Sequence, residues 1–251
     1  MRKLLIAGNW KMHKTIPESL ELVRKLSHSV KNITALDILV CPPFTALTSV
    51  YEAIKETNIK LGAQNLFWED AGAYTGEISP VMLKDVGCEY VIIGHSERRE
   101  YFGETDETVN KRIKAALKHN LKPIVCVGEK LEQREQGITE KVLETQILGG
   151  LKDLSESEIQ QITIAYEPVW AIGTGKTATP EIANSAQKFI RDKIAEIFNT
   201  QIAEKTRILY GGSVKPENAK DLLSQEHIDG ALVGGASLDA EKFAKIIEAG
   251  I

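Results

Sequence analysis

The sequence predicts a single (β/α)8 barrel that spans residues 1–251. Strand-type and helix-type segments alternate from one end of the chain to the other, which is the order that builds parallel sheets. The centres of the strand-type segments are almost continuously apolar, as in strands that are covered on both faces. Eight such units in 251 residues match the usual size of a closed barrel, about 250 residues. An open doubly wound sheet stays an alternative, because a sequence does not show closure.

The predicted strands are short runs of aliphatic and β-branched residues. Ile38-Leu39-Val40 and Val91-Ile92-Ile93 are typical of their centres. In order along the chain, the predicted strands are residues 4–10, 36–41, 59–64, 90–95, 123–128, 162–167, 207–211 and 230–234.

Helical segments lie between these strands. One follows Pro17 and carries an apolar stripe at helical spacing as far as Val30. Another is expected over residues 107–117, with charged residues on its outer side. Thr179-Pro180-Glu181 supplies an N-cap, a first-turn proline and a first-turn acid, which predicts a helix that continues to Ile197.

The composition indicates a globular chain with a large core. Hydrophobic residues make up 43% and charged residues 26%, a balance that excludes collagen, coiled coil and disorder. The chain has 31 basic and 35 acidic residues, a net charge of −4. A nucleic-acid-binding domain usually has a basic excess, so we expect no nucleic-acid partner. No linker or change of composition divides the chain, which favours one domain.

The same sequence gives no sign of a membrane or metal protein. Its apolar runs are too short to cross a membrane, and the N-terminal run ends at Gly8, short of a signal peptide. Its histidines are scattered, so we expect no metal site. Cys41, Cys88 and Cys126 lie in apolar surroundings without C-x-x-C spacing, which favours reduced, buried thiols in a cytoplasmic protein.

Polar and titratable residues gather where the predicted strands end. In a barrel these carboxyl ends form one rim, which is where chemistry takes place. Asn9 and Lys11 follow the first strand, and a fixed lysine there would attract an anionic substrate. An ordinary solvated lysine is the alternative.

Glu167 ends the sixth predicted strand, between Tyr166 and Pro168. A carboxylate partly removed from water there is expected to have a raised pKa and to act as a general base. A salt bridge that caps the strand is the alternative.

His95 ends the fourth predicted strand, and the next residues resemble the start of a helix. The amides of that helix would keep the imidazole neutral and make it a hydrogen-bond donor. A purely structural histidine is the alternative. Arg98 is expected to pair with Glu97.

The segment after Glu167 has the composition of a lid over a ligand, with an apolar middle and a glycine-rich end. A nucleotide-binding loop is disfavoured, because Trp170 and Ala178 stand where the two common motifs need glycine. An ordinary mobile loop is the alternative. The predicted lid residues are Pro168, Val169, Trp170, Ala171, Ile172, Gly173, Thr174, Gly175, Lys176 and Thr177.

Two glycine pairs suggest a phosphate site. Gly211-Gly212-Ser213 and Gly234-Gly235 follow the seventh and eighth strands, whose loops hold phosphate in many barrels. Each pair alone is also typical of a plain turn.

A long loop, which begins at Asn65 and ends at Ser79, carries Phe67, Trp68 and Tyr74. Exposed aromatic residues often mark a partner surface. Folding of the loop back over its own barrel is equally compatible with the sequence.

A base, a neutral donor, a cation, a phosphate site and a lid together favour proton transfer next to a carbonyl group, without a cofactor. Glu167 would remove a carbon-bound proton, and His95 and Lys11 would stabilise the resulting oxyanion. The lid would keep water from the reactive intermediate.

The same motifs resemble the triosephosphate isomerase family over essentially the whole chain, in the same order. They are Gly8-Asn9-Trp10-Lys11-Met12, Ile93-Gly94-His95-Ser96-Glu97-Arg98-Arg99, Ala165-Tyr166-Glu167-Pro168-Val169-Trp170-Ala171-Ile172-Gly173-Thr174-Gly175 and Tyr210-Gly211-Gly212-Ser213-Val214.

The resemblance implies that dihydroxyacetone phosphate and D-glyceraldehyde 3-phosphate interconvert through an enediolate. It implies that Glu167 is the base, His95 the electrophile and Glu97 an acid that supports the lysine. It also implies a homodimer in which the loop 65–79 docks beside the neighbour's active site. The substrate-binding residues implied by the resemblance are Asn9, Lys11, Gly173, Ser213, Gly234 and Gly235.

Two other functions remain open. A barrel aldolase or phosphosugar synthase would share the glycines after strand eight, but would need a Schiff-base lysine at a strand end or a metal site. A catalytically inactive barrel that acts as a scaffold would have lost Glu167, His95 or Lys11, and all three are present.

Overall fold

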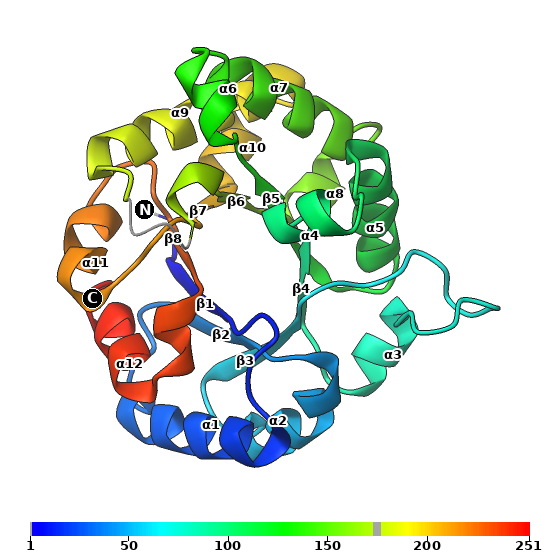
Figure 1. Cartoon of the computed structure of the whole chain (residues 1–251), viewed down its shortest axis with the longest axis vertical. Coiled ribbons are helices and arrows are strands. Elements are labelled where there is room, and N and C mark those ends of the chain that lie inside the picture. Colours follow the sequence, from blue (N-terminus) through cyan, green and yellow to red (C-terminus); the bar gives the residue numbers. More distant parts are fainter. Residues whose placement is uncertain (1, 173–176) are drawn as a thin grey trace.

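The structure, a computed structural model, describes residues 2–172 and 177–251. Its strands form one closed barrel, in which each strand pairs in parallel with the next and β8 pairs with β1. Helices surround this ring of strands (Figure 1). The predicted (β/α)8 barrel is therefore confirmed, and the open-sheet alternative is wrong. The strands are β1 (Leu5–Asn9), β2 (Asp37–Cys41), β3 (Ile59–Ala63), β4 (Tyr90–Ile93), β5 (Lys122–Val127), β6 (Thr163–Tyr166), β7 (Arg207–Tyr210) and β8 (Gly230–Val233).

The helices follow the strands in the order that the sequence predicts, with extra short turns in several connections. The α-helices are α1 (Ile16–Val30), α2 (Leu47–Ile54), α3 (Pro80–Asp85), α4 (Ser96–Tyr101), α5 (Asp106–Lys118), α6 (Leu131–Glu135), α7 (Thr139–Gly150), α8 (Glu156–Ile159), α9 (Pro180–Ile197), α10 (Thr200–Lys205), α11 (Pro216–Leu223) and α12 (Ala240–Glu248). The 3-10 turns are η1 (Phe44–Ala46), η2 (Val169–Ala171) and η3 (Gly235–Leu238).

The core has two layers, one between the strands and helices and one inside the barrel. Successive side chains of a strand point to opposite faces, so every second residue points inward. Asn9 continues this inward series on β1, and Glu167 continues it beyond β6. The pleat of the strands thus brings both side chains to the carboxyl end of the barrel interior. The inner layer consists of Leu5, Ala7, Leu39, Cys41, Tyr90, Ile92, Ile124, Cys126, Ala165, Leu209 and Leu232.

Two helix predictions are confirmed in detail. The apolar stripe of α1 is buried as far as Val30. The helix α9 begins at Pro180, and the Thr179 hydroxyl accepts a hydrogen bond from the Ile182 amide at 3.3 Å. This cap fixes where the connection from β6 ends and the helix begins.

The three cysteines are buried and form no disulfide, as predicted. Within residues 2–172 and 177–251, none of the helices has the length and apolar character that a membrane crossing requires.

Candidate active site

A cavity of about 750 Å³ opens at the carboxyl ends of the strands. Residues that follow β1, β4, β6, β7 and β8 line it, so strands far apart in the sequence contribute to one site. Among the predicted site residues, the cavity wall includes Asn9, Lys11, His95, Glu167, Ile172, Ser213, Gly234 and Gly235.

Glu167 lies at the inner wall of this cavity and is only 2% exposed. Its Oε1 lies 2.8 Å from His95 Nε2, and its Oε2 accepts a hydrogen bond from the Ser96 amide at 2.9 Å. A side chain at Gly211 would place its Cβ 2.8 Å from Glu167 Cγ. Glycine at position 211 therefore leaves the space that the carboxylate occupies.

The charge balance around Glu167 differs from the sequence-based expectation. Burial raises the pKa of the Glu167 carboxyl, but His95, the Ser96 amide and Lys11 lower it, and the net pKa lies below the usual glutamate value. The predicted raised pKa is wrong. The sequence indicated the apolar neighbours of Glu167 but not the three donors and charges that converge on it.

A change of backbone direction before His95 places its side chain at the cavity. Gly94 has a φ of +71°, in the left-handed region that favours glycine, so β4 ends at Ile93, two residues before His95. The next residue begins α4, and the Glu97 amide donates to His95 Nδ1 at 3.2 Å. An amide hydrogen can bond only to a ring nitrogen without a proton, so the proton of the neutral ring lies on Nε2.

Opposing effects act on the charge of His95. Burial lowers the pKa of the imidazole, whereas the Glu167 and Glu97 carboxylates raise it, and the net pKa lies above the usual histidine value. The contact of Nδ1 with the amide favours a neutral ring that donates from Nε2. A ligand oxygen that replaced the Glu167 carboxylate at Nε2 would remove the main effect that raises the pKa of His95. The neutral donor therefore stays our prediction for the ligand-bound site.

Lys11 stands across the cavity on the turn after β1. Its φ is +52°, an uncommon value for a residue with a side chain. Its amide donates to Asn9 Oδ1 at 3.0 Å, and its Nζ lies 2.5 Å from Glu97 Oε1. Glu97 is thus the ion-pair partner of Lys11, and the predicted Glu97–Arg98 pair is wrong because Arg98 pairs with Glu104.

The predicted lid lies only partly within the described residues. Ile172 lines the cavity, and the indole of Trp170 donates to Glu129 Oε1 at 2.8 Å. Arg134 lies 4.5 Å from the centre of the same indole ring. These contacts attach the start of the segment to the end of β5. Gly173, Thr174, Gly175 and Lys176 lie outside the described residues, and Thr177 is exposed.

The glycines after β8 leave the cavity wall open. A Cβ at Gly235 would have no atom within 4 Å, and one at Gly234 would lie 3.6 Å from Lys11 Cε. The protein itself therefore does not require glycine here for packing. The space that these residues leave free next to Ser213 is suited to a ligand group.

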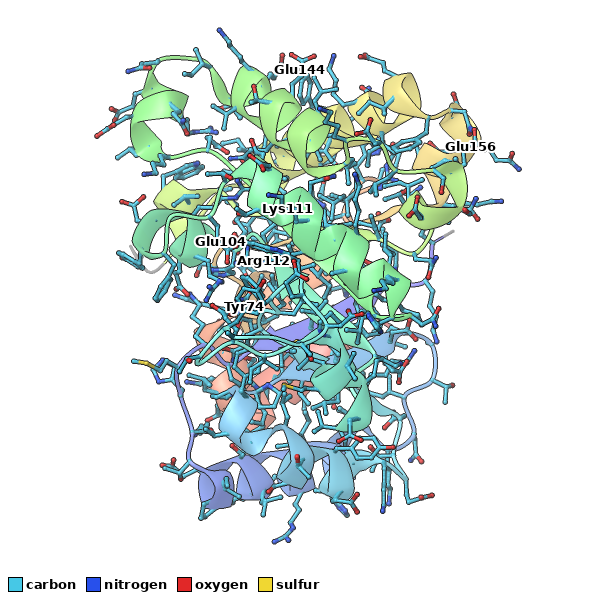
Figure 2. The ribbon with its side chains drawn as sticks, turned by 90° about the vertical axis from the view of Figure 1, so that its right-hand side faces the viewer. Tyr74, Glu104, Lys111, Arg112, Glu144 and Glu156 are labelled. Carbon is cyan, nitrogen blue, oxygen red and sulfur yellow. The ribbon has the colours of Figure 1, made fainter. Side chains whose placement is uncertain are left out.

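The loop 65–79 has a base that folds back over its own barrel, which is one of the two alternatives, and an exposed tip. Its base packs on its own barrel, where Asp70 Oδ1 lies 2.7 Å from His119 Nε2 and the rings of Phe67 and Trp68 stack with centres 4.2 Å apart. Residues 71–77 are all exposed, and the loop projects beyond the ring of helices near α3 (Figure 1). Figure 2 shows Tyr74 on this side of the molecule, with Glu104 and Arg112 nearby.

Among the described residues, no group of three or more histidine, cysteine, aspartate or glutamate side chains could hold a metal ion.

Comparison with known proteins decides the family. The sequence model of the family described as triosephosphate isomerase matches residues 4–250. The chain belongs to the triosephosphate isomerase family. A triosephosphate isomerase from Caldanaerobacter subterraneus subsp. tengcongensis is 61% identical over 247 residues, with 98% of this chain and 99% of the relative covered. One from Carboxydothermus hydrogenoformans is 57% identical over the full length of both chains.

A solved structure agrees with this assignment. The crystal structure of triosephosphate isomerase from Bartonella henselae superimposes with a TM-score of 0.90 at 41% identity, covering 98% of each chain. The family that the motifs predicted is thus confirmed, as is the barrel fold.

Sequence reasoning missed several members of this triosephosphate isomerase site. Gln64 donates from its side-chain amide to the Lys11 carbonyl, and the buried Glu129 accepts from Tyr166 Oη at 3.1 Å as well as from Trp170. Both lie at or just beyond the carboxyl end of a predicted strand, so the rule that found Glu167 would also have found them. The role of the Ser96 amide had no sequence signal, because a backbone group is present at every position.

Proposed function

We propose that this chain is a triosephosphate isomerase that interconverts dihydroxyacetone phosphate and D-glyceraldehyde 3-phosphate. The observation that carries the proposal is the meeting of Glu167, His95 and Lys11 in one cavity of a chain from this family. The site needs a base, a hydrogen-bond donor and a cation for this reaction, and these three side chains supply one each.

In the proposed reaction, the Glu167 carboxylate takes a proton from the carbon next to the substrate carbonyl. The electron pair of the broken C–H bond forms the enediolate, and its negative oxygen is stabilised by His95 Nε2–H and by Lys11 Nζ. A proton then passes from the hydroxyl oxygen on one enediolate carbon to the negative oxygen on the other, and Glu167 returns its proton to that second carbon. The electron pair left on the first oxygen forms the new carbonyl group. Atoms and electrons balance within the substrate and these side chains, so the mechanism requires no cofactor.

We propose that Ser213, Gly234 and Gly235 bind the substrate phosphate, together with Gly173. The position of the first three after β7 and β8 supports this, because barrels hold phosphate at these strand ends. Pro168 to Thr177 would then cover the bound substrate and exclude water. Asn9, at the end of the neighbouring strand β1, is proposed to contact the substrate as well.

We also propose a homodimer formed through the loop 65–79. Large apolar side chains are exposed on the turns and helices that follow β1 to β4, on the same side as the loop. Met12 is 93% exposed, Tyr101 76% and Phe102 67%. Tyr74, Val81 and Met82 are exposed as well. Exposed apolar side chains that gather on one side of a molecule often mark a partner surface. A second copy of the chain would cover it.

We propose that residues 1–251 form one domain and that the protein works in the cytoplasm. Continuous strand order supports the single domain, and three unbridged cysteines suit a reducing compartment.

The test is phosphorus NMR of the purified protein with D-glyceraldehyde 3-phosphate, without added metal or cofactor. Rapid appearance of dihydroxyacetone phosphate is expected. No conversion by folded protein would overturn the proposal and favour the inactive scaffold. Conversion to a different phosphate ester would favour another phosphate-binding barrel enzyme.

A further inference from the structure

Gln64 lies directly after β3 and holds two backbone carbonyls with one side-chain amide. Its Nε2 donates to the Lys11 carbonyl at 2.8 Å and to the Cys41 carbonyl at 2.9 Å. A primary amide has two N–H donors, so both are used. The Cys41 carbonyl also accepts from the Trp10 amide at 3.1 Å. Gln64 therefore joins the end of β2 to the turn that carries Lys11.

The hydrogen bonds of Gln64 hold Lys11, a residue with an uncommon backbone conformation. Lys11 has a φ of +52°, where its own Cβ crowds the backbone, so the surrounding structure must hold it there. Its amide is held by Asn9 Oδ1 and its carbonyl by Gln64. With both ends of the residue fixed, the side chain leaves the turn toward the cavity and reaches Glu97.

We propose that Gln64 is a positioning residue that sets the direction of the Lys11 side chain and so fixes its ammonium group at the substrate. The inference rests on the proposed function, in which Lys11 contacts the anionic substrate. Among the described residues that line the cavity, Lys11 is present and Gln64 is not, so Gln64 acts through Lys11. Its two hydrogen bonds define one geometry of the turn, and their loss frees the Lys11 carbonyl to rotate.

The test compares Gln64→Met with a matched control on the same strand. Methionine has a similar length but no N–H donor. Asn58, which precedes β3 at the opposite end of the barrel, also donates to two carbonyls, those of Val30 at 2.8 Å and Ile33 at 2.7 Å. Asn58→Leu therefore removes the same kind of bridge far from the cavity.

The probe is 2-phosphoglycolate, a phosphate ester whose carboxylate resembles the enediolate, with affinity measured by calorimetry. Gln64→Met should weaken binding about tenfold and lower kcat/KM by about 100-fold, the size of effect expected when a catalytic group is displaced by about 1 Å. Asn58→Leu should leave the affinity unchanged even if it lowers the unfolding temperature. Equal losses of 2-phosphoglycolate affinity in the two variants would overturn the proposal, because they would indicate a general loosening of the barrel.

A double variant tests whether Gln64 acts through Lys11. In a Lys11→Met background, Gln64→Met should cause no further loss of 2-phosphoglycolate affinity. A loss that persists undiminished would overturn the proposal. If the variants change 2-phosphoglycolate affinity as expected but the wild type does not isomerise the substrate, the proposed function fails and the positioning role of Gln64 stands.

Gln64→Glu keeps the proposal testable if the methionine variant does not fold. A neutral carboxylic acid can donate one hydrogen bond, whereas a carboxylate can donate none and repels both carbonyls. Relative to the wild type at the same pH, the variant should bind 2-phosphoglycolate more weakly as pH rises and its new carboxyl ionises. If the ratio of the variant's dissociation constant to that of the wild type did not change with pH, the role of the hydrogen bonds donated by Gln64 would be contradicted.

Discussion

At the scale of single residues, the proposed function depends on how Glu167 is held before substrate arrives. The carboxylate is almost fully buried, yet the His95 ring and the Ser96 amide each occupy one of its oxygens. These donors keep it ionised, which a base requires. A substrate carbonyl that takes over His95 Nε2 would leave Glu167 with one donor fewer and make it a stronger base.

Replacing Glu167 by glutamine should therefore strongly reduce catalysis without preventing a ligand from binding in the cavity. The amide cannot accept the proton, so kcat should fall by about 100- to 10,000-fold, while 2-phosphoglycolate should still bind. Steady-state kinetics and calorimetry measure the two effects. Glu107→Gln, on the exposed face of α5, is the control and should leave kcat unchanged. Normal turnover by the Glu167 variant would refute the assignment of the base.

The pKa of Glu167 offers a second test at this scale. In the free protein the pKa of the carboxyl should lie below the usual glutamate value, because His95, Ser96 and Lys11 together outweigh the effect of burial. Lys11→Met removes one of these lowering effects, so the pKa of Glu167 should rise. Carbon NMR of labelled carboxyl groups measures both values, and it avoids the ionisation of the substrate phosphate at about pH 6. A pKa above the usual glutamate value in the wild type would contradict this charge arrangement.

The side chains to which the proposed function assigns the chemistry were predictable, because barrels place chemistry at strand ends. Glu167, His95 and Lys11 were found in this way. The pKa of Glu167 was not predictable, since it depends on Ser96 and Lys11, whose distance from the carboxylate only the closed barrel sets. The predicted partner of Arg98, Glu97, was wrong for a similar reason. Glu104 reaches Arg98 across a turn that contains a glycine at positive φ.

At the scale of elements, helix caps place the segments that carry the site. The strands were predicted within two residues of their observed ends, and most predictions ran too long because site residues such as Glu167 follow the strand without belonging to it. The start of α9 was predicted to the residue, since Thr179 and Pro180 both act locally. A helix start that depends on adjacent residues can be predicted from the sequence, whereas the residue at which β-strand pairing stops depends on the neighbouring strand.

The cap of α9 should contribute measurably to stability. Thr179→Ala removes the hydroxyl that accepts from the Ile182 amide, and it should lower the free energy of unfolding by about 1 kcal/mol. Equilibrium unfolding in urea measures this change. Thr179→Ser keeps the hydroxyl and should retain most of the stability. If the alanine and serine variants were equally stable, the cap would not contribute.

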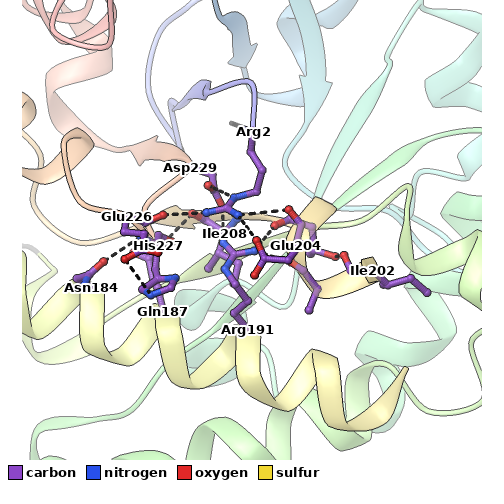
Figure 3. A network of polar contacts seen from close by, with 12 residues as sticks. Arg2, Asn184, Gln187, Arg191, Ile202, Glu204, Ile208, Glu226, His227 and Asp229 are labelled. Carbon is purple, nitrogen blue, oxygen red and sulfur yellow. Dashed lines mark hydrogen bonds and ion pairs between the residues drawn. The ribbon is translucent and has the colours of Figure 1, made fainter. Parts of the chain in front are cut away.

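At the scale of the whole molecule, the end of the barrel opposite the active site is closed by a buried ionic network (Figure 3). Asp229 pairs with Arg191 at 2.6 Å and with Arg2 at 2.5 Å, and it also accepts from the Ile208 amide at 2.8 Å. Arg191 donates in addition to the Thr206 carbonyl at 2.8 Å. The network thus joins the start of the chain to α9, β7 and the segment before β8.

Asp229→Ala should destabilise the whole barrel. It leaves the guanidinium of Arg191, whose side chain is 4% exposed, without its charge partner. The expected loss is about 3–5 kcal/mol in the free energy of unfolding. Asp192→Ala breaks an exposed pair with Lys188 on the same helix and should cost at most about 1 kcal/mol. Similar losses in the two variants would argue against the network as a closure of the barrel.

The proposed dimer is the largest-scale consequence of the loop 65–79. The loop carries exposed residues on a base that is fixed to α5 through Asp70, so it reaches outward as a preformed element. Its tip includes Tyr74, which is 44% exposed and has its ring 4.6 Å from that of Phe67. A symmetric partner would cover this tip and the apolar side chains around Tyr101 and Phe102.

Cutting back Tyr74 and Thr75 to alanine should shift the protein toward monomer. Loss of a central aromatic anchor typically costs about 2 kcal/mol of binding free energy, so the dimer dissociation constant should rise about 30-fold. Analytical ultracentrifugation over a range of protein concentrations measures it. Leu148→Ala is the control, since this exposed leucine of α7 lies on another face and should not affect association. A dimer that stays intact in the double variant, or that weakens equally in the control, would place the interface elsewhere. A monomeric wild type would overturn the proposed dimer.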